Sequence, residues 1–365
     1  MISPEDRERA LNWLYETGNP IIRLWAAERL GAPADELARL RAEMIAHPAV
    51  QYWVDCLLSA AEKPVIHNSF DTCLENSMRK VLLFGVREQD DRRLKYFNDG
   101  ALDRLSHLLE HPGWLNPVEY TILASYLNAM GRSEKAVLDT LRERLDAAHW
   151  FAANGEYDIH TYPAGYPTIP AARRSHPLIH PKFYPDNRYL YPLVYDLFAW
   201  SRLPAALNTP DNAGKIDAVI RCVLDERYQQ LPWGYGLIFV KPNKYYGMGW
   251  SVHLPRFFGE EEQRISASGS LWWAEAMAPF PAAAGSGWFQ HMLEHLNGFR
   301  TADGMWKFPA AYLTEAKDKY FVGGGHMGLG EDRKNRDALK IESTVWMMQI
   351  YELTGIHSAK TGTET

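Results

Sequence analysis

The sequence contains few cysteines and no long apolar segment, and both absences narrow the class of protein. Its three cysteines, Cys56, Cys73 and Cys222, lie far apart, so they predict neither a disulfide framework nor a CxxC metal site. No apolar stretch approaches the roughly 20 residues that cross a bilayer. The charged N-terminus lacks the apolar core of a signal peptide. We therefore expect a cytoplasmic protein without a membrane span.

An excess of positive charge is also absent. Lysine and arginine number 39 against 45 aspartates and glutamates, so the formal net charge is -6. Because binding to the nucleic-acid backbone needs a basic face, we expect no nucleic-acid partner. A small-molecule substrate is the expected partner, and nothing in the sequence indicates an oligomeric state.

Aromatic residues, in contrast, are abundant. They make up 13% of the chain and include 13 tryptophans, more than an average core needs. Ring faces line cavities that bind apolar, carbohydrate or cationic ligands. The composition therefore favours an aromatic-lined cavity, with a tryptophan-rich core as the alternative.

The pattern of apolar residues and helix stops predicts a helical protein. Helical periodicity breaks repeatedly at a glycine, as at Gly31, Gly85, Gly131 and Gly355, and glycine suits the left-handed residue that ends a helix. Intervals of roughly 40 to 70 residues between such stops are typical of stacked or ringed helix pairs.

Two long loops rich in proline and glycine, 154–188 and 298–336, interrupt the predicted helices, and a short hairpin is expected within 236–252. A long loop in a compact protein is usually functional. Because no linker separates one part of the chain from another, we predict a single helical domain over residues 1–365.

The loop from Arg300 to Trp306, Arg-Thr-Ala-Asp-Gly-Met-Trp, resembles the Gln-x3-Gly-x-Trp repeat of squalene–hopene cyclases and related terpenoid cyclases, with Arg300 in the place of glutamine. Together with the helix-pair period, it makes the chain similar to the α/α-toroid superfamily, which also includes protein prenyltransferase β subunits, helical-barrel dehydratases and carbohydrate-active enzymes. The resemblance implies an all-α fold, an (α/α)6 toroid-like helical barrel with long functional loops at one rim. The Asp-x-Asp-Asp acid of type II terpenoid cyclases has its nearest match at Glu88-Gln-Asp90-Asp91, where helix capping is the alternative.

Four segments carry candidate site residues, and the first contains His67, Asp71 and Glu75. Asp71 and Glu75 lie four residues apart and share one face of a helix predicted over 69–84. Burying two carboxylates on an apolar face costs free energy unless the carboxylates are paired or serve in catalysis. Desolvation and mutual repulsion raise one pKa, which suits a general acid. The alternative is that Asp71 caps the helix and Glu75 pairs with Arg79.

The second and third segments combine histidine with aromatic rings. An extended chain at 157–162 places Asp158 beside His160, where the carboxylate orients the imidazole for acid–base chemistry. The alternative is a loop held by hydrogen bonds. In 233–256, glycines bring the backbone close to a ligand and His253 joins several rings, with aromatic packing as the alternative. The candidate substrate-binding residues of these segments are Tyr157, Tyr162, Tyr235, Tyr246 and Trp250.

The fourth segment runs from Trp306 to Glu331. Its sequence Gly-Gly-Gly-His-Met-Gly-Leu-Gly-Glu predicts a tightly curled loop that presents His326 and Glu331, and packing explains such a sequence poorly. It is not a phosphate-binding loop, because it lacks the Gly-Lys-Ser/Thr ending. Trp306 and Phe308 are further candidates for contact with a substrate.

Metal binding is not expected. The order His-x2-Glu-His occurs at 107–111 and 291–295, but no third ligand is indicated for either pair. We therefore predict neither a metal nor another cofactor.

These residues together predict a metal-independent acid–base enzyme of the cyclase, isomerase or lyase type, which acts on an apolar or isoprenoid-like small molecule in an aromatic-lined cavity. Asp71 or Glu75 is the expected acid, with His160, His253 or His326 as its partner. Tryptophan and tyrosine faces would stabilise developing positive charge. One alternative is a carbohydrate-active hydrolase or lyase of the helical-barrel type, and another is a non-catalytic scaffold that binds a ligand or a peptide.

Overall fold

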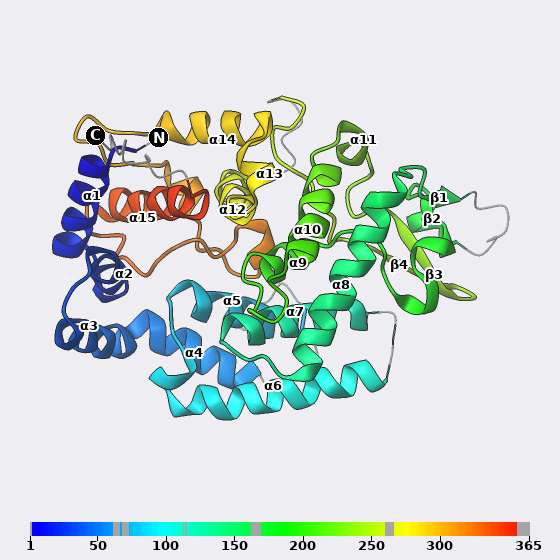
Figure 1. Ribbon diagram of the computed structural model, residues 1–365, viewed down its shortest axis with the longest axis horizontal. Helices are drawn as coiled ribbons and strands as arrows, with labels where there is room; N and C mark the ends of the chain where they lie inside the picture. Colours follow the sequence, from blue (N-terminus) through cyan, green and yellow to red (C-terminus); the bar gives the residue numbers. More distant parts are fainter. Residues whose placement is uncertain are drawn as a thin grey trace. The chain divides into compact units, whose positions relative to one another are not determined.

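A computed structural model describes residues 2–60, 66–67, 73–111, 113, 115–161, 169–259 and 266–355. The chain is mostly helical, with one small sheet (Figure 1). Contacts between residues divide it into two compact units. Unit 1 is Met1–Phe97 with Phe258–Thr365, and unit 2 is Asn98–Phe257. The prediction of a single domain stays a prediction.

Unit 1 contains helices from both ends of the chain. Their bounds are α1 Pro4–Thr17, α2 Pro20–Leu30, α3 Ala34–Ala46, α4 Pro48–Ala60, α5 Leu74–Leu83, α12 Ala267–Met277, α13 Pro281–Ala284, α14 Gly287–Asn297 and α15 Ala338–Leu353, with short 3-10 turns η1 Glu88–Asp90, η7 Ala310–Leu313 and η8 Phe321–Gly323. Helix α6, Arg92–Glu110, begins in unit 1 and continues into unit 2.

Local sequence sets the helix ends as expected. Proline stands at the first position of α1 and of α2, where its missing N–H costs nothing, and the preceding Ser3 and Asn19 accept hydrogen bonds from the first turns. Gly31 ends α2 with a φ of +70°, the left-handed conformation that glycine adopts without strain.

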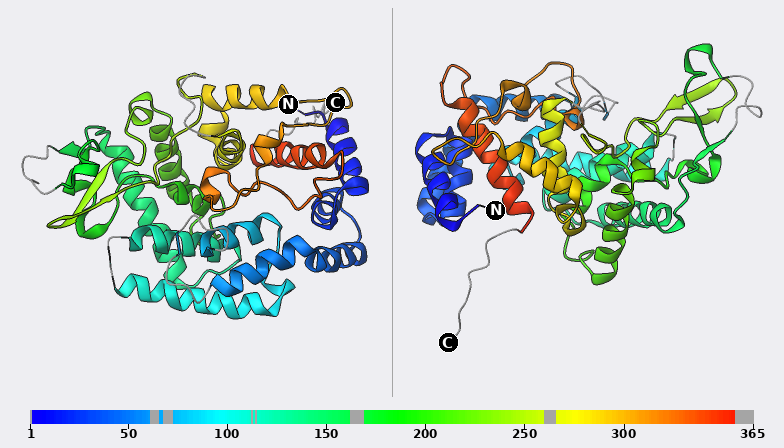
Figure 2. Two further views of the ribbon diagram at one scale, coloured as in Figure 1. Left: turned by 180° about the vertical axis from the view of Figure 1, so that it is seen from behind. Right: turned by 90° about the horizontal axis from the view of Figure 1, so that it is seen from above.

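The helix contacts of unit 1 form a closed series. Helices α1 to α5 each pack on the next, α5 contacts η8, and η8 contacts α12. Helix α12 packs on α15, and α15 packs on α1. Figures 1 and 2 show α15 (red) beside α1 (blue), so the first and the last helix of the chain lie side by side.

The long segment between α14 and α15 packs against most of these helices. The N–H groups of Trp306 and Phe308 donate to Thr344 and Ser343 of α15. Further along the segment, a Cβ on Gly330 would lie 3.2 Å from Ile21 of α2 and 3.3 Å from Ala49 of α4. The predicted loop 298–336 is therefore a structural part of unit 1, buried in stretches such as 324–329.

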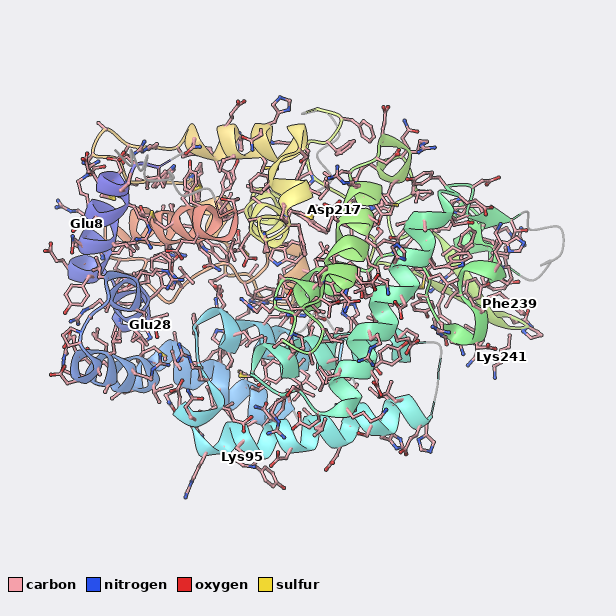
Figure 3. The ribbon with its side chains drawn as sticks, viewed as in Figure 1. Glu8, Glu28, Lys95, Asp217, Phe239 and Lys241 are labelled. Atoms are coloured by element: carbon pink, nitrogen blue, oxygen red, sulfur yellow. The ribbon has the colours of Figure 1, made fainter. Side chains whose placement is uncertain are left out.

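Unit 2 consists of helices and the sheet. After α6 come α7 Asn116–Ala129, α8 Lys135–Asn154, α9 Val194–Trp200, α10 Pro210–Val223 and α11 Glu226–Gln229. Helix α8 packs on α7, α9 and α10. Figure 3 labels Asp217 on α10, whose carboxylate pairs with Arg221 one turn later. Helix α9 begins only at Val194, just after Pro192, whose ring does not fit the interior of a helix.

The sheet corrects the prediction of a purely all-α chain. Its strands β1 His160–Thr161, β2 Leu178–Ile179, β3 Leu237–Lys241 and β4 Lys244–Gly247 stand in this order. Strand β2 pairs antiparallel with β1 and parallel with β3, and β3 and β4 form an antiparallel hairpin. The hairpin was predicted, but its second strand is 244–247 and not 247–252. Ile169, Leu178, Leu237 and Tyr245 form a small core on this sheet, with Phe239 packed against it (Figure 3).

In the described part of the chain, no helix combines the length and the apolarity that crossing a membrane requires.

Candidate active site

Helix α5 buries polar side chains, which makes it unlike an ordinary amphipathic helix. All its residues from Leu74 to Val81 are buried, and five of the eight are polar or charged. A surface helix normally keeps its polar face in water, and burial of charge is costly without partners. The polar residues are Glu75, Asn76, Ser77, Arg79 and Lys80. Their partners locate the candidate site.

Glu75 forms a buried acid–imidazole pair with His67. Its side chain is 0% exposed, that of His67 is 14% exposed, and Oε2 lies 2.6 Å from His67 Nδ1. The other oxygen, Oε1, is buried with no hydrogen-bond partner in the described residues. The ring of His67 stacks on Tyr320 at 4.9 Å between centres, and Tyr320 is 42% exposed. The pair is thus buried at its carboxylate end and covered by a surface tyrosine.

Lys80 lies one turn after Asn76 and joins a second cluster. Its ammonium donates to Glu315 and to the carbonyl of Gly328, and it lies 5.0 Å from the centre of the Phe84 ring. Glu315 Oε2 lies 3.9 Å from Nδ1 of His326. His326 Nε2 is 3.0 Å from the carbonyl oxygen of Lys319. Because a carbonyl only accepts, Nε2 carries a proton.

Glu315 is the solvent-facing member of this cluster. Its side chain is 41% exposed, whereas those of Lys80 and His326 are each 2% exposed. Burial raises the pKa of Glu315, but the Lys80 charge, the hydrogen bond from Lys80 and the nearby His326 outweigh it and hold the pKa below its ordinary value. Glu315 is therefore a carboxylate at neutral pH, in reach of solvent.

Asn76 connects the two clusters through the backbone of 319–321. Its amide nitrogen donates to the carbonyl of Lys319 at 2.9 Å, and its amide oxygen accepts from the N–H of Phe321 at 2.9 Å. The residue between them is Tyr320, which covers His67. The same Lys319 carbonyl accepts from His326. Asn76 thus places the covering tyrosine and the second histidine together.

Packing accounts for the glycines that precede and follow His326. Gly324 has a φ of +75°, and a Cβ there would lie 2.5 Å from the backbone of Ser268 at the start of α12. A Cβ on Gly325 would lie 2.5 Å from Lys319, and one on Gly328 would lie 2.7 Å from Glu315. The loop curls tightly, as predicted, and packing of its backbone against Ser268, Lys319 and Glu315 is the reason for its glycines.

Glu331 and Glu342 hold the end of this loop. Glu342 of α15 is fully buried and accepts from the N–H groups of Leu329 and Glu331 and from Arg333. Glu331 accepts from the N–H of Asn19 at 2.5 Å. Burial raises the pKa of both carboxyls. Glu331, a predicted substrate-binding residue, therefore anchors the loop to the start of α2.

Trp306 and Phe308 are part of the unit 1 core. Both are about 1% exposed. Trp306 Nε1 donates to Asn297 at 3.2 Å, and Phe308 packs edge-on against Phe299 and stacks on Tyr312. Neither ring reaches the surface where a substrate would dock.

The acidic sequence Glu88-Gln-Asp90-Asp91 caps helices. Asp90 accepts from the N–H of Arg87 at 2.7 Å, and Asp91 accepts from the N–H of Arg93 at 2.9 Å. Asp90 also pairs with Arg41. These bonds support helix capping as the role of the acidic sequence, and not the role of a cyclase acid.

The two predicted histidines of unit 2 bind backbone. His160 Nε2 lies 2.7 Å from the carbonyl oxygen of Tyr235, Asp158 is exposed, and no hydrogen bond joins Asp158 to His160 in the described residues. His253 contacts Ser251 through Nδ1 at 2.7 Å and the carbonyl of Leu231 through Nε2 at 2.8 Å. Both rings brace the loops that surround them.

The tyrosines of unit 2 form a buried hydrogen-bonded cluster. Tyr228 and Tyr235 bond through their hydroxyls, and the Tyr235 hydroxyl donates to the carbonyl of Pro192. Burial raises the pKa of both, so they stay neutral. The hydroxyl of Tyr157 lies 3.6 Å from Sγ of Cys222, whose pKa burial raises to about 11.

The other predicted ligand contacts of unit 2 fall at the sheet and beside α9. Tyr246 is half-buried on β4. Trp250 is buried, and its carbonyl accepts from the N–H of Val194 at the start of α9. Two further predicted residues, Asp71 and Tyr162, lie outside the described residues. The described residues contain no group of three histidines, cysteines or acids arranged to hold a metal.

Sequence reasoning missed Lys80, Glu315 and Tyr320. Lysine on a predicted helix is ordinarily exposed, and its acid partner stands 235 residues later. One available indication was the polar sequence Glu-Asn-Ser-Met-Arg-Lys inside a helix with apolar neighbours on every side.

No protein-family model, curated protein or solved structure matches the chain.

Proposed function

We propose that the protein is an acid–base enzyme whose reaction takes place in unit 1, and that it cleaves a glycosidic linkage by hydrolysis or elimination. The observation that carries the proposal is the fully buried Glu75 bonded to His67 at 2.6 Å. His67 transfers the proton, and Glu75 orients the imidazole through Nδ1, so the exchange with substrate occurs at Nε2.

The burial of Glu75 supports a role in proton transfer. An ionised carboxylate with one unpartnered oxygen is costly in an apolar interior. An imidazole that holds the transferred proton beside this carboxylate offsets that cost. Such preorganised charge is the usual basis of electrostatic catalysis.

The second carboxylate and the surface tyrosine support a sugar as substrate. Glycosidases use two carboxyl groups, and Glu315 is an exposed carboxylate beside His326. The exposed ring of Tyr320 offers a flat apolar face with a polar tip, which suits a ring that has both apolar and hydroxyl-bearing faces.

Charge at the site favours this substrate over an isoprenoid. The two clusters consist of charged and polar groups, Lys80, Glu315, His326, His67 and Glu75, whereas apolar substrates are held by mostly apolar linings. The terpenoid-cyclase-like alternative needs an apolar cavity around the acid, and a polyprenyl substrate in the same assay tests it.

The toroid resemblance and the cytoplasmic location belong to the same proposal. The closed series of helix contacts in unit 1 supports a ring of helices, although segment 298–336 fills part of it. All three cysteines are buried free thiols, which suits a reducing compartment.

The experiment is an activity screen of the full chain against neutral and acidic polysaccharides, read by new reducing ends and by absorbance of an unsaturated product. His67→Asn should lower kcat by about a hundredfold or more, the usual contribution of general acid–base catalysis. Glu75→Gln should lower kcat as well, because the neutral amide no longer stabilises the imidazolium.

The matched control is His295→Asn. His295 is also a unit 1 histidine and bonds the hydroxyl of Tyr312 at 2.6 Å. It should leave kcat within about twofold. If His67→Asn retains full activity while folded, the assignment of the proton transfer to this pair is wrong.

A further inference from the structure

The hairpin of unit 2 and the turn beside it expose a group of cations. Lys241 ends strand β3 and Lys244 begins strand β4, and both side chains are exposed. The 3-10 turn η3, Ala171–Arg173, ends with Arg173, which is half-buried, and the exposed Arg174 follows it. These four residues are called the cationic hairpin surface. Figure 3 labels Lys241 at the end of β3.

Backbone geometry places three of these cations, Lys241, Lys244 and Arg173, beside one another. Lys241 and Lys244 are directly opposite partners in the β3–β4 register, and Asn243 in the turn between them has a φ of +62°. Arg173 Nη1 donates to the carbonyl of Tyr245 on β4 at 3.0 Å, so its guanidinium lies at the edge of the same strand. The remaining N–H groups of Arg173 are available for a ligand.

No carboxylate in the described residues pairs with any of the four. Segments 169–182 and 237–247 contain no aspartate or glutamate, although the chain as a whole is acidic. Cations elsewhere are commonly paired, as Arg39 is with Glu36 and Glu43. Like charges directly opposite in a strand pair are destabilising, so their presence at this hairpin calls for an anionic partner or for protection of the sheet edge.

We propose that the cationic hairpin surface binds the carboxylate or sulfate groups of an acidic polysaccharide. That the ligand is a polysaccharide rests on the proposed function, whereas the recognition of its anionic groups rests on the cations of the hairpin itself. Arginine forks bind planar oxyanions with two parallel hydrogen bonds, and lysines add point charges. The surface is a binding site of unit 2, distinct from the residues that transfer protons in unit 1.

The extent of the surface favours a polysaccharide over duplex nucleic acid. Proteins that bind DNA through its backbone typically make about 6 to 10 phosphate contacts, whereas this surface offers four cations on a chain whose formal net charge is -6. Nucleic-acid binding is a separate outcome of the test.

The experiment measures binding of the full chain to heparin and to polygalacturonate, with neutral dextran and a short DNA duplex as comparisons, at several salt concentrations. Lys241→Gln with Lys244→Gln should raise the Kd for the acidic polysaccharides about tenfold, or 1.4 kcal/mol, and flatten the salt dependence. The control pair is Arg92→Gln with Lys334→Gln, which removes the same charge from exposed positions of unit 1 and should leave the Kd unchanged.

His67→Asn separates this inference from the proposed function, because it should abolish turnover and leave heparin binding intact. Equal Kd values for the hairpin and control pairs would overturn the inference. So would tighter binding of the duplex than of either polysaccharide, or a hairpin pair that aggregates without any change in Kd, which would assign the lysines to edge protection.

Discussion

The substitution Gly324→Ala tests whether packing explains the glycine run before His326. At a φ of +75° an alanine is strained, which costs about 1 to 2 kcal/mol. The added Cβ would lie 2.5 Å from the carbonyl carbon of Ser268 and 2.6 Å from the nitrogen of Gly269, against 3.4–4 Å for ordinary contact. The start of α12 must therefore shift by about an ångström, at a further cost of about 1 to 3 kcal/mol.

The expected loss of stability is about 2 to 4 kcal/mol, after allowance for the smaller entropy of the unfolded alanine chain. Thermal unfolding followed by circular dichroism should show Tm lowered by roughly 5 to 15 °C. Gly323→Ala is the matched control, because a Cβ there meets nothing within 4 Å, and it should change stability by less than about 0.5 kcal/mol. Equal effects of the two substitutions would refute the reasoning.

Three further predictions concern other residues. Asp196→Ala should destabilise the protein by about 3 to 5 kcal/mol, because it leaves the buried guanidinium of Arg144 without the two hydrogen bonds of 2.8 and 3.0 Å that it makes to Asp196. Urea unfolding measures this loss of stability, and a loss below about 1 kcal/mol would contradict the prediction. His253→Ala should lower the free energy of unfolding by about 1 to 3 kcal/mol, because Ser251 and the Leu231 carbonyl lose their hydrogen bonds to the imidazole. An unchanged urea midpoint would instead favour a catalytic role for His253. Burial raises the pKa of Glu331 above its ordinary 4.5, so the folded state holds this proton more tightly and stability falls as pH rises from the ordinary value through the raised one. Glu331→Gln should flatten that fall in Tm measured from acid to neutral pH, and a curve identical to that of the wild type would disprove the assignment.

Most helices could be predicted because their ends are encoded locally. Asn19-Pro20 begins α2 and Gly31 ends it, and such caps act within a few residues. The sheet was predicted only as a hairpin, because β1 and β2 are two residues long and exist through pairing with distant strands. Local propensity has no information on such pairing.

The candidate site was predicted in part. Residue type and spacing singled out His67, Glu75 and His326. Lys80 and Glu315 become candidates only through their contact with each other, which joins residues 235 positions apart. His160 and His253 have the same residue type as a catalytic imidazole. Only the fold shows that their nitrogens face backbone carbonyls.

The bonds between α5 and the C-terminal segment have a consequence for synthesis on the ribosome. Asn76 bonds Lys319 across 243 positions, and Lys80 bonds Gly328 across 248. Unit 1 is split in the sequence by the whole of unit 2, so the polar residues of α5 emerge long before their partners are translated. Unit 2 is therefore complete first, and until the C-terminal segment is translated the polar residues of the N-terminal helices lack their hydrogen-bond partners. During this interval the nascent chain depends most on chaperones.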